Sequence, residues 1–229
     1  MGCILNIETS TNICSVALTV EDEVVFSKES FEGPSHATLL GVFVEEALAF
    51  IDANNLKLVA VAVSCGPGSY TGLRIGVSMA KGLCFGYGLP LISIPTLQLL
   101  ANKAISVCQG EDQIYCSMLD ARRMEVYAAM FDNKLNQLRA TAADIVDENT
   151  YAEWLKSNKV CFFGNGAAKC MDVIASDNAI LLEGIEPLAS DMASLSAKAF
   201  AENKFEDVAY FEPFYLKEFV ATVAKNKVL

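Results

Sequence analysis

The glycine-rich stretch of residues 64–76, with the sequence SCGPGSYTGLRIG, constrains this chain more than any other part of it. The apolar run of residues 56–64 predicts a buried strand, and residues 72–87 predict a helix. Because glycine tolerates backbone angles that a β-carbon forbids, the stretch predicts a tight turn between the two elements. Ser69 or Thr71 can cap the helix that follows.

A helix that begins at such a turn presents unpaired backbone N–H groups, which can bind an anion. The residues predicted to contact an anion or a nucleotide are Gly66, Gly68, Ser69, Thr71 and Gly72. The alternative is a capped turn without a ligand. Two phosphate-binding motifs are excluded, because a P-loop needs a lysine well before Lys81 and the dinucleotide motif needs glycine where Thr71 stands.

The remaining elements follow in a regular order along the chain. In the first half we predict strands at 3–9, 13–20 and 23–30, a helix at 35–53 entered through Gly33 and Pro34, the strand at 56–64, the helix at 72–87, a strand at 91–94 and a helix at 96–107. In the second half we predict strands at 113–119, 125–131 and 135–140, a helix at 149–157, a strand at 160–163, a helix at 167–175, a strand at 180–183 and a helix at 191–202. The two halves therefore predict two copies of one α/β topology, each a mixed sheet flanked by helices.

A polar, glycine-containing break at residues 108–112 marks the expected boundary between the two copies. We expect an N-terminal subdomain of residues 1–108, which carries the helices of a partner interface, and a C-terminal subdomain of residues 109–229. The pattern leaves open an arrangement in which the last helix packs back on the first subdomain.

The charge balance argues against direct binding of nucleic acid. The net charge is −11 and the pI is about 4.6, whereas a phosphate-binding face depends on clustered Lys and Arg. No apolar run approaches the roughly 18 residues of a membrane span, and the first residues lack a signal-peptide pattern, so we expect a cytoplasmic protein. The 8 cysteines include no C-x-x-C pair and are expected to be reduced thiols.

Neither catalytic residues nor a metal site are predicted. His36 is the only histidine, and Leu40 stands four residues later, so an H-x-x-x-H metal pair is absent. A zinc site would therefore consist mainly of carboxylates, which is uncommon. A Ser-His-Asp triad would have to use the same His36, and no G-x-S-x-G motif occurs. We expect His36 to be exposed in the first turn of its helix.

The helices at 35–53 and 72–87 are strongly apolar. The first has an apolar arc too wide for one sheet, and the second is apolar all round and rich in glycine, which weakens a helix by roughly 1 kcal/mol per residue. Either both are deeply buried in their own domain, or they face a second subunit. The residues of the expected partner interface are Leu40, Phe43, Ala47, Ile51, Arg74, Gly76, Ala80 and Leu83.

Motifs at residues 4–11, 66–76, 120–122 and 213–217 resemble those of the TsaB (YeaZ) family. Their sequences are ILNIETST, GPGSYTGLRIG, DAR and PFYLK. The resemblance covers nearly the whole chain and is strongest in the first half, although family members more often carry Asp where this chain has Glu8. It implies the duplicated ribonuclease-H-like fold of the actin, heat-shock chaperone and sugar-kinase superfamily.

The resemblance also implies a subunit that has no activity of its own and helps to form threonylcarbamoyladenosine in tRNA. The catalytic subunit TsaD would transfer the threonylcarbamoyl group from threonylcarbamoyl-AMP to the adenosine beside the anticodon, in tRNAs that read codons beginning with A. The two apolar helices would pair with TsaD, or with a second copy of this chain when it is alone. The ATPase TsaE would join the assembly, ATP or ADP is a candidate ligand at the subunit interface, and tRNA would be contacted only indirectly.

Two other functions stay open at this point. One is an ATP-dependent small-molecule kinase of the same superfamily, in which Glu8 would hold magnesium and residues 164–167 would form a phosphate cradle or a plain turn. The first turn, residues 8–11, lacks the glycine that such kinases use. The other is a glycoprotein-type metallopeptidase. For the charged turn at 120–123 we expect a surface ion pair or an Asx-type turn.

Overall fold

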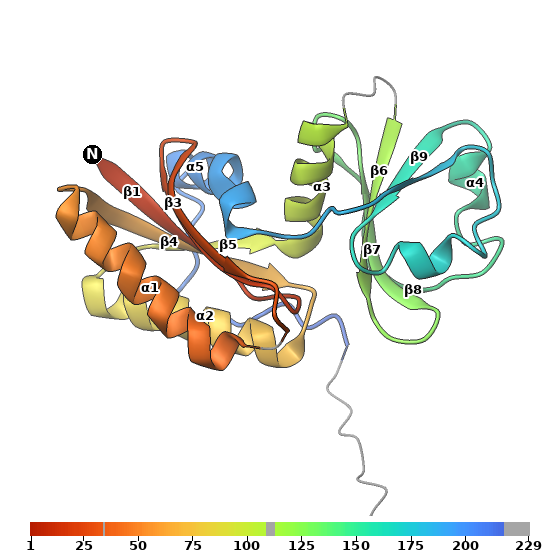
Figure 1. The fold of residues 1–229 in the computed structure, drawn as a ribbon. Coiled ribbons are helices and arrows are strands. Elements are labelled where there is room, and N and C mark those ends of the chain that lie inside the picture. Colours follow the sequence, from red (N-terminus) through yellow and green to blue (C-terminus); the bar gives the residue numbers. More distant parts are fainter. Residues whose placement is uncertain (34, 109–112, 218–229) are drawn as a thin grey trace, which may run out of the picture.

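The computed structural model describes residues 1–33, 35–108 and 113–217 of the chain. The predicted helix entry at Pro34, residues 109–112 of the predicted boundary, and residues 218–229 of the predicted C-terminal subdomain lie outside the described residues. Two mixed five-stranded sheets form two lobes that lie side by side (Figure 1). We call them the first lobe, built on β1 to β5, and the second lobe, built on β6 to β10.

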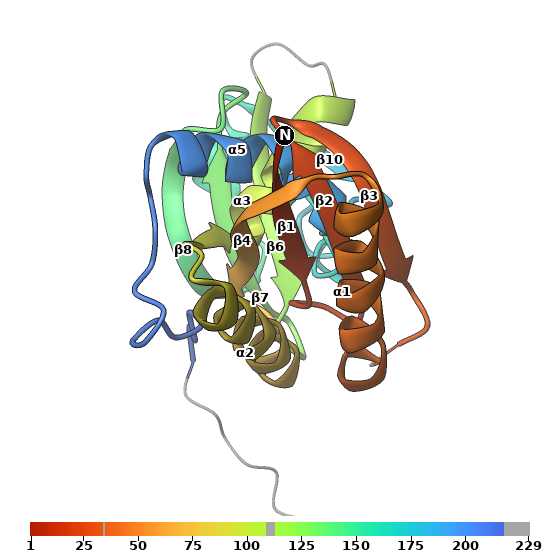
Figure 2. The same cartoon turned by 90° about the vertical axis from the view of Figure 1, so that its left-hand side faces the viewer.

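The first lobe has the strand order β3-β2-β1-β4-β5. Its strands are β1 (Gly2–Glu8), β2 (Cys14–Val20), β3 (Glu23–Ser30), β4 (Lys57–Gly66) and β5 (Leu91–Pro95). β1 pairs with β2 antiparallel and with β4 parallel. The helices α1 (His36–Ala53) and α2 (Tyr70–Tyr87) lie next to each other on one face of this sheet (Figure 2), where they cover Cys3, Leu5 and Ile7 of β1.

The second lobe has the order β10-β9-β6-β7-β8, which is the same arrangement with each strand replaced by its counterpart. Its strands are β6 (Gln113–Asp120), β7 (Glu125–Phe131), β8 (Gln137–Ile145), β9 (Lys159–Phe163) and β10 (Ala179–Leu182). β6 pairs with β7 antiparallel and with β9 parallel, as β1 does with β2 and β4. The predicted α/β fold with a duplicated ribonuclease-H-like topology is therefore confirmed.

The lobes exchange the helices that follow their last strands. α3 (Thr96–Val107) follows β5 of the first lobe but packs on β6 and β7 of the second, where Ser117 donates a hydrogen bond to the carbonyl oxygen of Leu97 at 2.7 Å. α5 (Ala193–Ala201) follows β10 of the second lobe but packs on β1 and β5 of the first. Met192, just before α5, is fully buried beside Ile4 and Ile92. Each lobe thus contains a helix from the other half of the chain.

The helices predicted in the second lobe are shorter than expected. α4 comprises only Ala152–Leu155 instead of residues 149–157, and its C-cap is Lys156. Just beyond it, the side-chain amide of Asn158 donates to the carbonyl of Trp154 at 2.9 Å. The predicted helix at 167–175 is wrong. Successive hydrogen bonds there span three residues, so the segment forms a short 3₁₀ helix at Ala168–Cys170. The predicted helix at 191–202 divides into a 3₁₀ turn at Ala189–Met192 and α5.

Candidate partner interface and inter-lobe cleft

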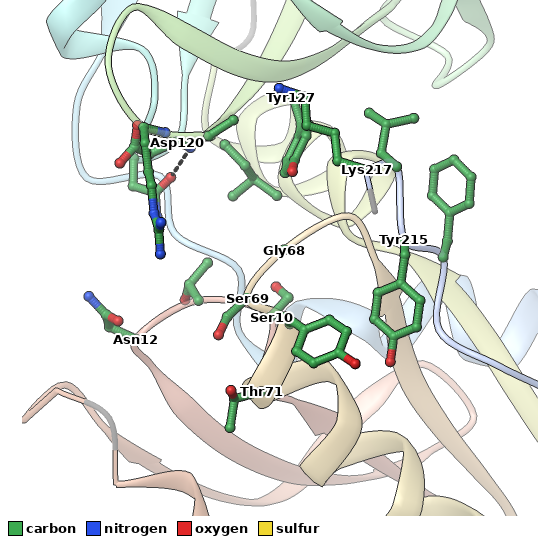
Figure 3. Close-up of a pocket in the computed structure, with 17 residues that line it drawn as sticks. Ser10, Asn12, Gly68, Ser69, Thr71, Asp120, Tyr127, Tyr215 and Lys217 are labelled. Carbon is green, nitrogen blue, oxygen red and sulfur yellow. Dashed lines mark hydrogen bonds between the residues drawn. The ribbon is translucent and has the colours of Figure 1, made fainter. Parts of the chain in front are cut away.

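A cleft of about 540 Å³ lies between the two lobes. The loop after β1 and the start of α2 form its first wall, where Figure 3 labels Ser10 and Ser69, and the loop after β6 forms the second, where it labels Asp120. Asn165 lies beside Asp120. Tyr127 of β7 and residues 214–217 complete the lining. The cleft therefore opens where β1 and β6, the two equivalent central strands, both end.

The glycine-rich turn of the first lobe packs directly on the loop after β1. A β-carbon at Gly68 would lie 2.4 Å from the carbonyl oxygen of Ser10, and the N–H of Ser69 donates to that oxygen at 2.7 Å. The Ser69 hydroxyl accepts from the N–H of Gly72 at 3.3 Å, which confirms the predicted cap of α2. Only Gly68, Ser69 and Thr71 of the predicted anion contacts line the cleft, whereas Gly66 and Gly72 are buried behind it.

The second lobe places a matching turn on the opposite side of the cleft. The Asn165 side chain accepts a hydrogen bond from the N–H of Asp120 at 2.9 Å, and the N–H of Gly166 donates to the carbonyl of Met118 at 3.1 Å. The N–H of Arg122 donates to the carboxylate of Asp120 at 3.0 Å, so the expected Asx-type turn is present. The ion pair of Asp120 is made with Lys169.

Glu8 lies fully buried at the end of β1 and does not line the cleft. Its Oε1 accepts a hydrogen bond from the N–H of Ser10 at 2.5 Å, and its Oε2 has no hydrogen-bond partner among the described residues. Burial raises the pKa of Glu8 to about 7, and the hydrogen bond from the N–H of Ser10 opposes that rise. The carboxyl thus holds the loop after β1 in place, and its burial does not suit the magnesium contact considered for a kinase.

The segment of residues 205–217, which we call the strap, runs back along α2 to the cleft. Lys81 of α2 donates to the carbonyl oxygens of Ala209 at 3.2 Å and Phe211 at 2.9 Å. The N–H of Phe214 donates to the carbonyl of Cys65 at 2.7 Å, next to the glycine-rich turn. The strap ends at Lys217, which forms an ion pair with Glu125 of the second lobe. The motif at 213–217 therefore folds back over the chain itself.

Tyr70 lies where the strap, the cleft and α2 meet. The rings of Tyr70 and Tyr215 lie 5.0 Å apart, and Nη1 of Arg74 donates to the Tyr70 hydroxyl at 2.7 Å. Figure 3 shows Tyr215 beside the cleft. These tyrosines were not among the predicted site residues. The signal available in the sequence was their position inside the two motifs at 66–76 and 213–217.

A mostly apolar groove of about 840 Å³ runs along the outer surface of α2 towards the start of α1. It is lined by Ala37, Tyr70, Thr71, Arg74, Ile75, Ser78, Met79, Gly82 and Leu83. Gly82 is exposed, and a β-carbon there would meet no atom within 4 Å. The groove is therefore wide open at the middle of α2.

The predicted interface residues divide between this surface and the core. Arg74 is exposed and Leu83 half-buried, and both line the groove, while Phe43 is half-buried on α1. The members that are buried in the first lobe's own core are Leu40, Ala47, Ile51, Gly76 and Ala80. The reason is that the inward stripes of α1 and α2 cover the sheet, so in the single chain these five residues belong to its core and not to its surface.

His36 is buried, with 5% of its surface exposed, so the prediction of an exposed histidine was wrong. Its Nε2 lies 3.1 Å from the carbonyl oxygen of Ile13, the residue just before β2. The described residues place no three His, Cys, Asp or Glu side chains close enough together to hold a metal ion. Across the same ranges, no helix combines the length and the apolar character needed to cross a bilayer.

Comparisons with known proteins agree on one family. Residues 30–229 match the family model described as "TsaD: tRNA N6-adenosine threonylcarbamoyltransferase". The Escherichia coli K12 protein named tRNA threonylcarbamoyladenosine biosynthesis protein TsaB is 31% identical over 95% of this chain and 96% of its own length. The Bacillus subtilis protein of the same name is 31% identical over 71% of this chain and 70% of its own length.

Among solved structures, the fold is similar to that of YeaZ from Pseudomonas aeruginosa. The TM-score is 0.77 at 26% sequence identity, and the match covers 94% of this chain and 100% of that one. Sequence motifs, family model, curated relatives and fold lead to the same assignment. The chain therefore belongs to the threonylcarbamoyladenosine biosynthesis family that the TsaD model describes, and within it to the TsaB (YeaZ) proteins.

Proposed function

We propose that this chain acts in the cytoplasm as the partner subunit that stabilises and activates TsaD. TsaD would transfer the threonylcarbamoyl group to the adenosine beside the anticodon, in tRNAs that read codons beginning with A. TsaE would join the assembly, and tRNA would be reached only through these partners, in keeping with the net charge of −11. Alone, the chain would pair with a second copy through the same surface.

The groove along α2 carries this proposal. Ile75, Met79 and Leu83 are each half-buried there, so apolar surface stays in contact with water when the chain is alone. Exposed Gly82 leaves room for the backbone of another helix to approach closely, as small residues do at helix crossings. An apolar groove with an open backbone at its centre suits the helices of another subunit.

Gly82→Glu tests the proposed interface. Replacing glycine inside a helix favours the helix by roughly 1 kcal/mol, and the new side chain meets no atom of its own chain, so we expect the variant to fold normally. The added carboxylate would be desolvated and unpaired in the complex. We expect the affinity for TsaD to fall at least tenfold, so that the two proteins no longer co-elute in size-exclusion chromatography. Formation of threonylcarbamoyladenosine should fall with it.

The matched control is Gln137→Glu, which adds the same charge at an exposed position of β8 in the second lobe. It should bind TsaD as the unmodified chain does. Unchanged co-elution of Gly82→Glu with TsaD would exclude the groove as the contact surface and refute the proposal.

For a nucleotide at the subunit interface, we propose Gly68, Ser69 and Thr71 as the contact positions. These residues line the cleft beside the exposed start of α2, where backbone N–H groups point outward from the helix. Gly66 and Gly72 are buried and are not included. The close approach of Gly68 to Ser10 leaves no space for a ligand between the turn and the loop after β1, so a phosphate would have to lie on the cleft side.

A further inference from the structure

Two of the eight cysteines lie against the same side-chain oxygen. The Sγ of Cys108 lies 3.5 Å from Oε1 of Gln113, and the Sγ of Cys161 lies 3.0 Å from that atom. The three residues come from different elements: Cys108 follows α3, Gln113 begins β6, and Cys161 lies in β9. Both thiols belong to the apolar cluster that Leu100 and Ala104 of α3 help to form, so they lie on the side of the sheet that α3 covers.

The two thiols differ in accessibility. Cys108 is half-buried, whereas Cys161 is fully buried. Burial, and after it the neighbouring Cys108 thiol, raise the pKa of Cys161 to about 12, so this sulfur stays protonated at neutral pH. An oxidant from solution can therefore reach Cys108 first, and Cys161 remains a protonated thiol next to it.

The backbone of Cys108 is held in place from two directions. Its N–H donates to the carbonyl of Ala104 at 2.9 Å, and its carbonyl oxygen accepts a hydrogen bond from the hydroxyl of Tyr115 at 2.8 Å. Tyr115 is the direct neighbour of Cys161 across the β6 and β9 pair. The positions of the two sulfurs are thus set by α3, β6 and β9, which pack together in the second lobe.

We propose that Cys108 and Cys161 form an oxidisable dithiol that hydrogen peroxide converts to a disulfide. The thiolate of Cys108 attacks one peroxide oxygen, the O–O bond breaks, and Cys108 becomes a sulfenic acid while hydroxide takes up a proton to leave as water. The sulfur of Cys161 then bonds to the sulfur of Cys108. The sulfenic oxygen leaves as a second water with the proton of Cys161. Two thiols lose two electrons in total, and one peroxide is reduced to two waters.

The disulfide would tie the end of α3 to β9. Since α3 connects β5 of the first lobe to the sheet of the second, the bond would fasten the connection between the lobes. In a reducing cell such a bond forms only transiently, which suits a response to oxidants and not a permanent structural link.

Mass spectrometry of peroxide-treated protein tests the proposal. The reduced chain is treated with hydrogen peroxide, and its free thiols are then alkylated in denaturant. We expect two of the eight thiols to escape alkylation, a mass lower by two hydrogen atoms before alkylation, and a proteolytic peptide that joins Cys108 to Cys161. The thermal unfolding midpoint of the oxidised protein should rise, because the bond restrains the unfolded chain.

Cys108→Ser should abolish the cross-link and the rise in midpoint, and Cys65→Ser, which changes another half-buried cysteine, should leave both unchanged. The peptide map of the unmodified protein decides the matter even if a variant folds poorly. Oxygen adducts on Cys108 without a bond to Cys161, a bond to any other cysteine, or cross-links only between two chains would each overturn the proposal.

Discussion

Glu8 makes the stability of this protein depend on pH below neutrality. Burial raises its pKa from 4.5 to about 7, so between these values the folded state keeps a proton that the unfolded chain has released. The contribution of the protonated carboxyl is complete below about pH 4.5 and is lost as the pH rises through about 7. At most this amounts to roughly 3 kcal/mol.

We therefore expect Glu8→Gln to be more stable than the unmodified chain at about pH 8 and to lose less stability between about pH 5 and 8. Gln keeps an oxygen that can accept from the N–H of Ser10 and carries no charge. Urea unfolding across this range measures the difference. Glu29→Gln, at an exposed position of β3, is the control; an equal pH dependence in Glu8→Gln and the unmodified chain would contradict the assignment.

Two glycines of α2 should respond in opposite directions to the same substitution. A β-carbon at Gly76 would lie 2.2 Å from Oγ1 of Thr9, which itself donates to the carbonyl of Gly72 at 2.8 Å. We expect Gly76→Ala to cost about 1–3 kcal/mol, because α2 must move away from β1 or the Thr9 hydrogen bond must break. Gly82→Ala should instead stabilise by roughly 1 kcal/mol. Urea unfolding midpoints compare the two, and a shift of the same sign would show that the packing of Gly76 is not tight.

At the level of single residues, the sequence showed which chemical groups are present, but it was a poorer guide to whether a side chain is buried or exposed. The absence of a second histidine followed directly from the sequence, but the burial of His36 against the Ile13 carbonyl, just before β2, did not, because it depends on a tertiary contact. Likewise the pattern of apolar residues identified Leu40 and Ala80 as important without showing that they face the chain's own sheet. Periodicity reveals an apolar stripe, and the tertiary fold decides what covers it.

Lys81 of α2 contacts the strap at two carbonyl oxygens. Lys81→Met keeps the apolar stem of the side chain but removes the donor to two strap carbonyls. We expect amide hydrogen exchange across residues 207–215 to become roughly tenfold faster, which corresponds to the loss of about 1.4 kcal/mol. Lys103→Met, which removes the ion pair with Asp191 near α5, is the control and should leave exchange in the strap unchanged. Equal exchange rates in the strap of all three proteins would show that Lys81 does not hold it.

At the level of elements, prediction succeeded where local signals were strong. Ser69 begins α2 and Gly88, with φ of 64°, ends it, and the start and end of that helix follow from such residues. The short helices of the second lobe were overpredicted. At residues 167–175 an apolar pattern was present, but the backbone followed 3₁₀ hydrogen bonds around Cys170, a choice that periodicity does not specify.

At the level of the whole molecule, the sequence allowed the duplicated topology to be predicted but not the contacts between distant segments. The order of strands and helices along the chain predicted two mixed sheets, and the structure gives the spatial order of their strands. The stacking of Tyr215 on Tyr70 and the hydrogen bond from Phe214 to Cys65 join positions far apart in the chain, and nothing in local composition identifies such partners. The division into residues 1–108 and 109–229 stays a prediction.

The exchanged helices also bear on how this protein is made. A ribosome releases β1 to β5 long before it releases residues 193–201, so during synthesis the sheet face that carries Ile4, Ala60 and Ile92 lacks α5 and has only Leu99 of α3 to cover part of it. Most of that face therefore stays exposed to water until nearly the whole chain has been synthesised. Translation speed and early capture by folding helpers will therefore matter more for the yield of this protein than its compact final form suggests.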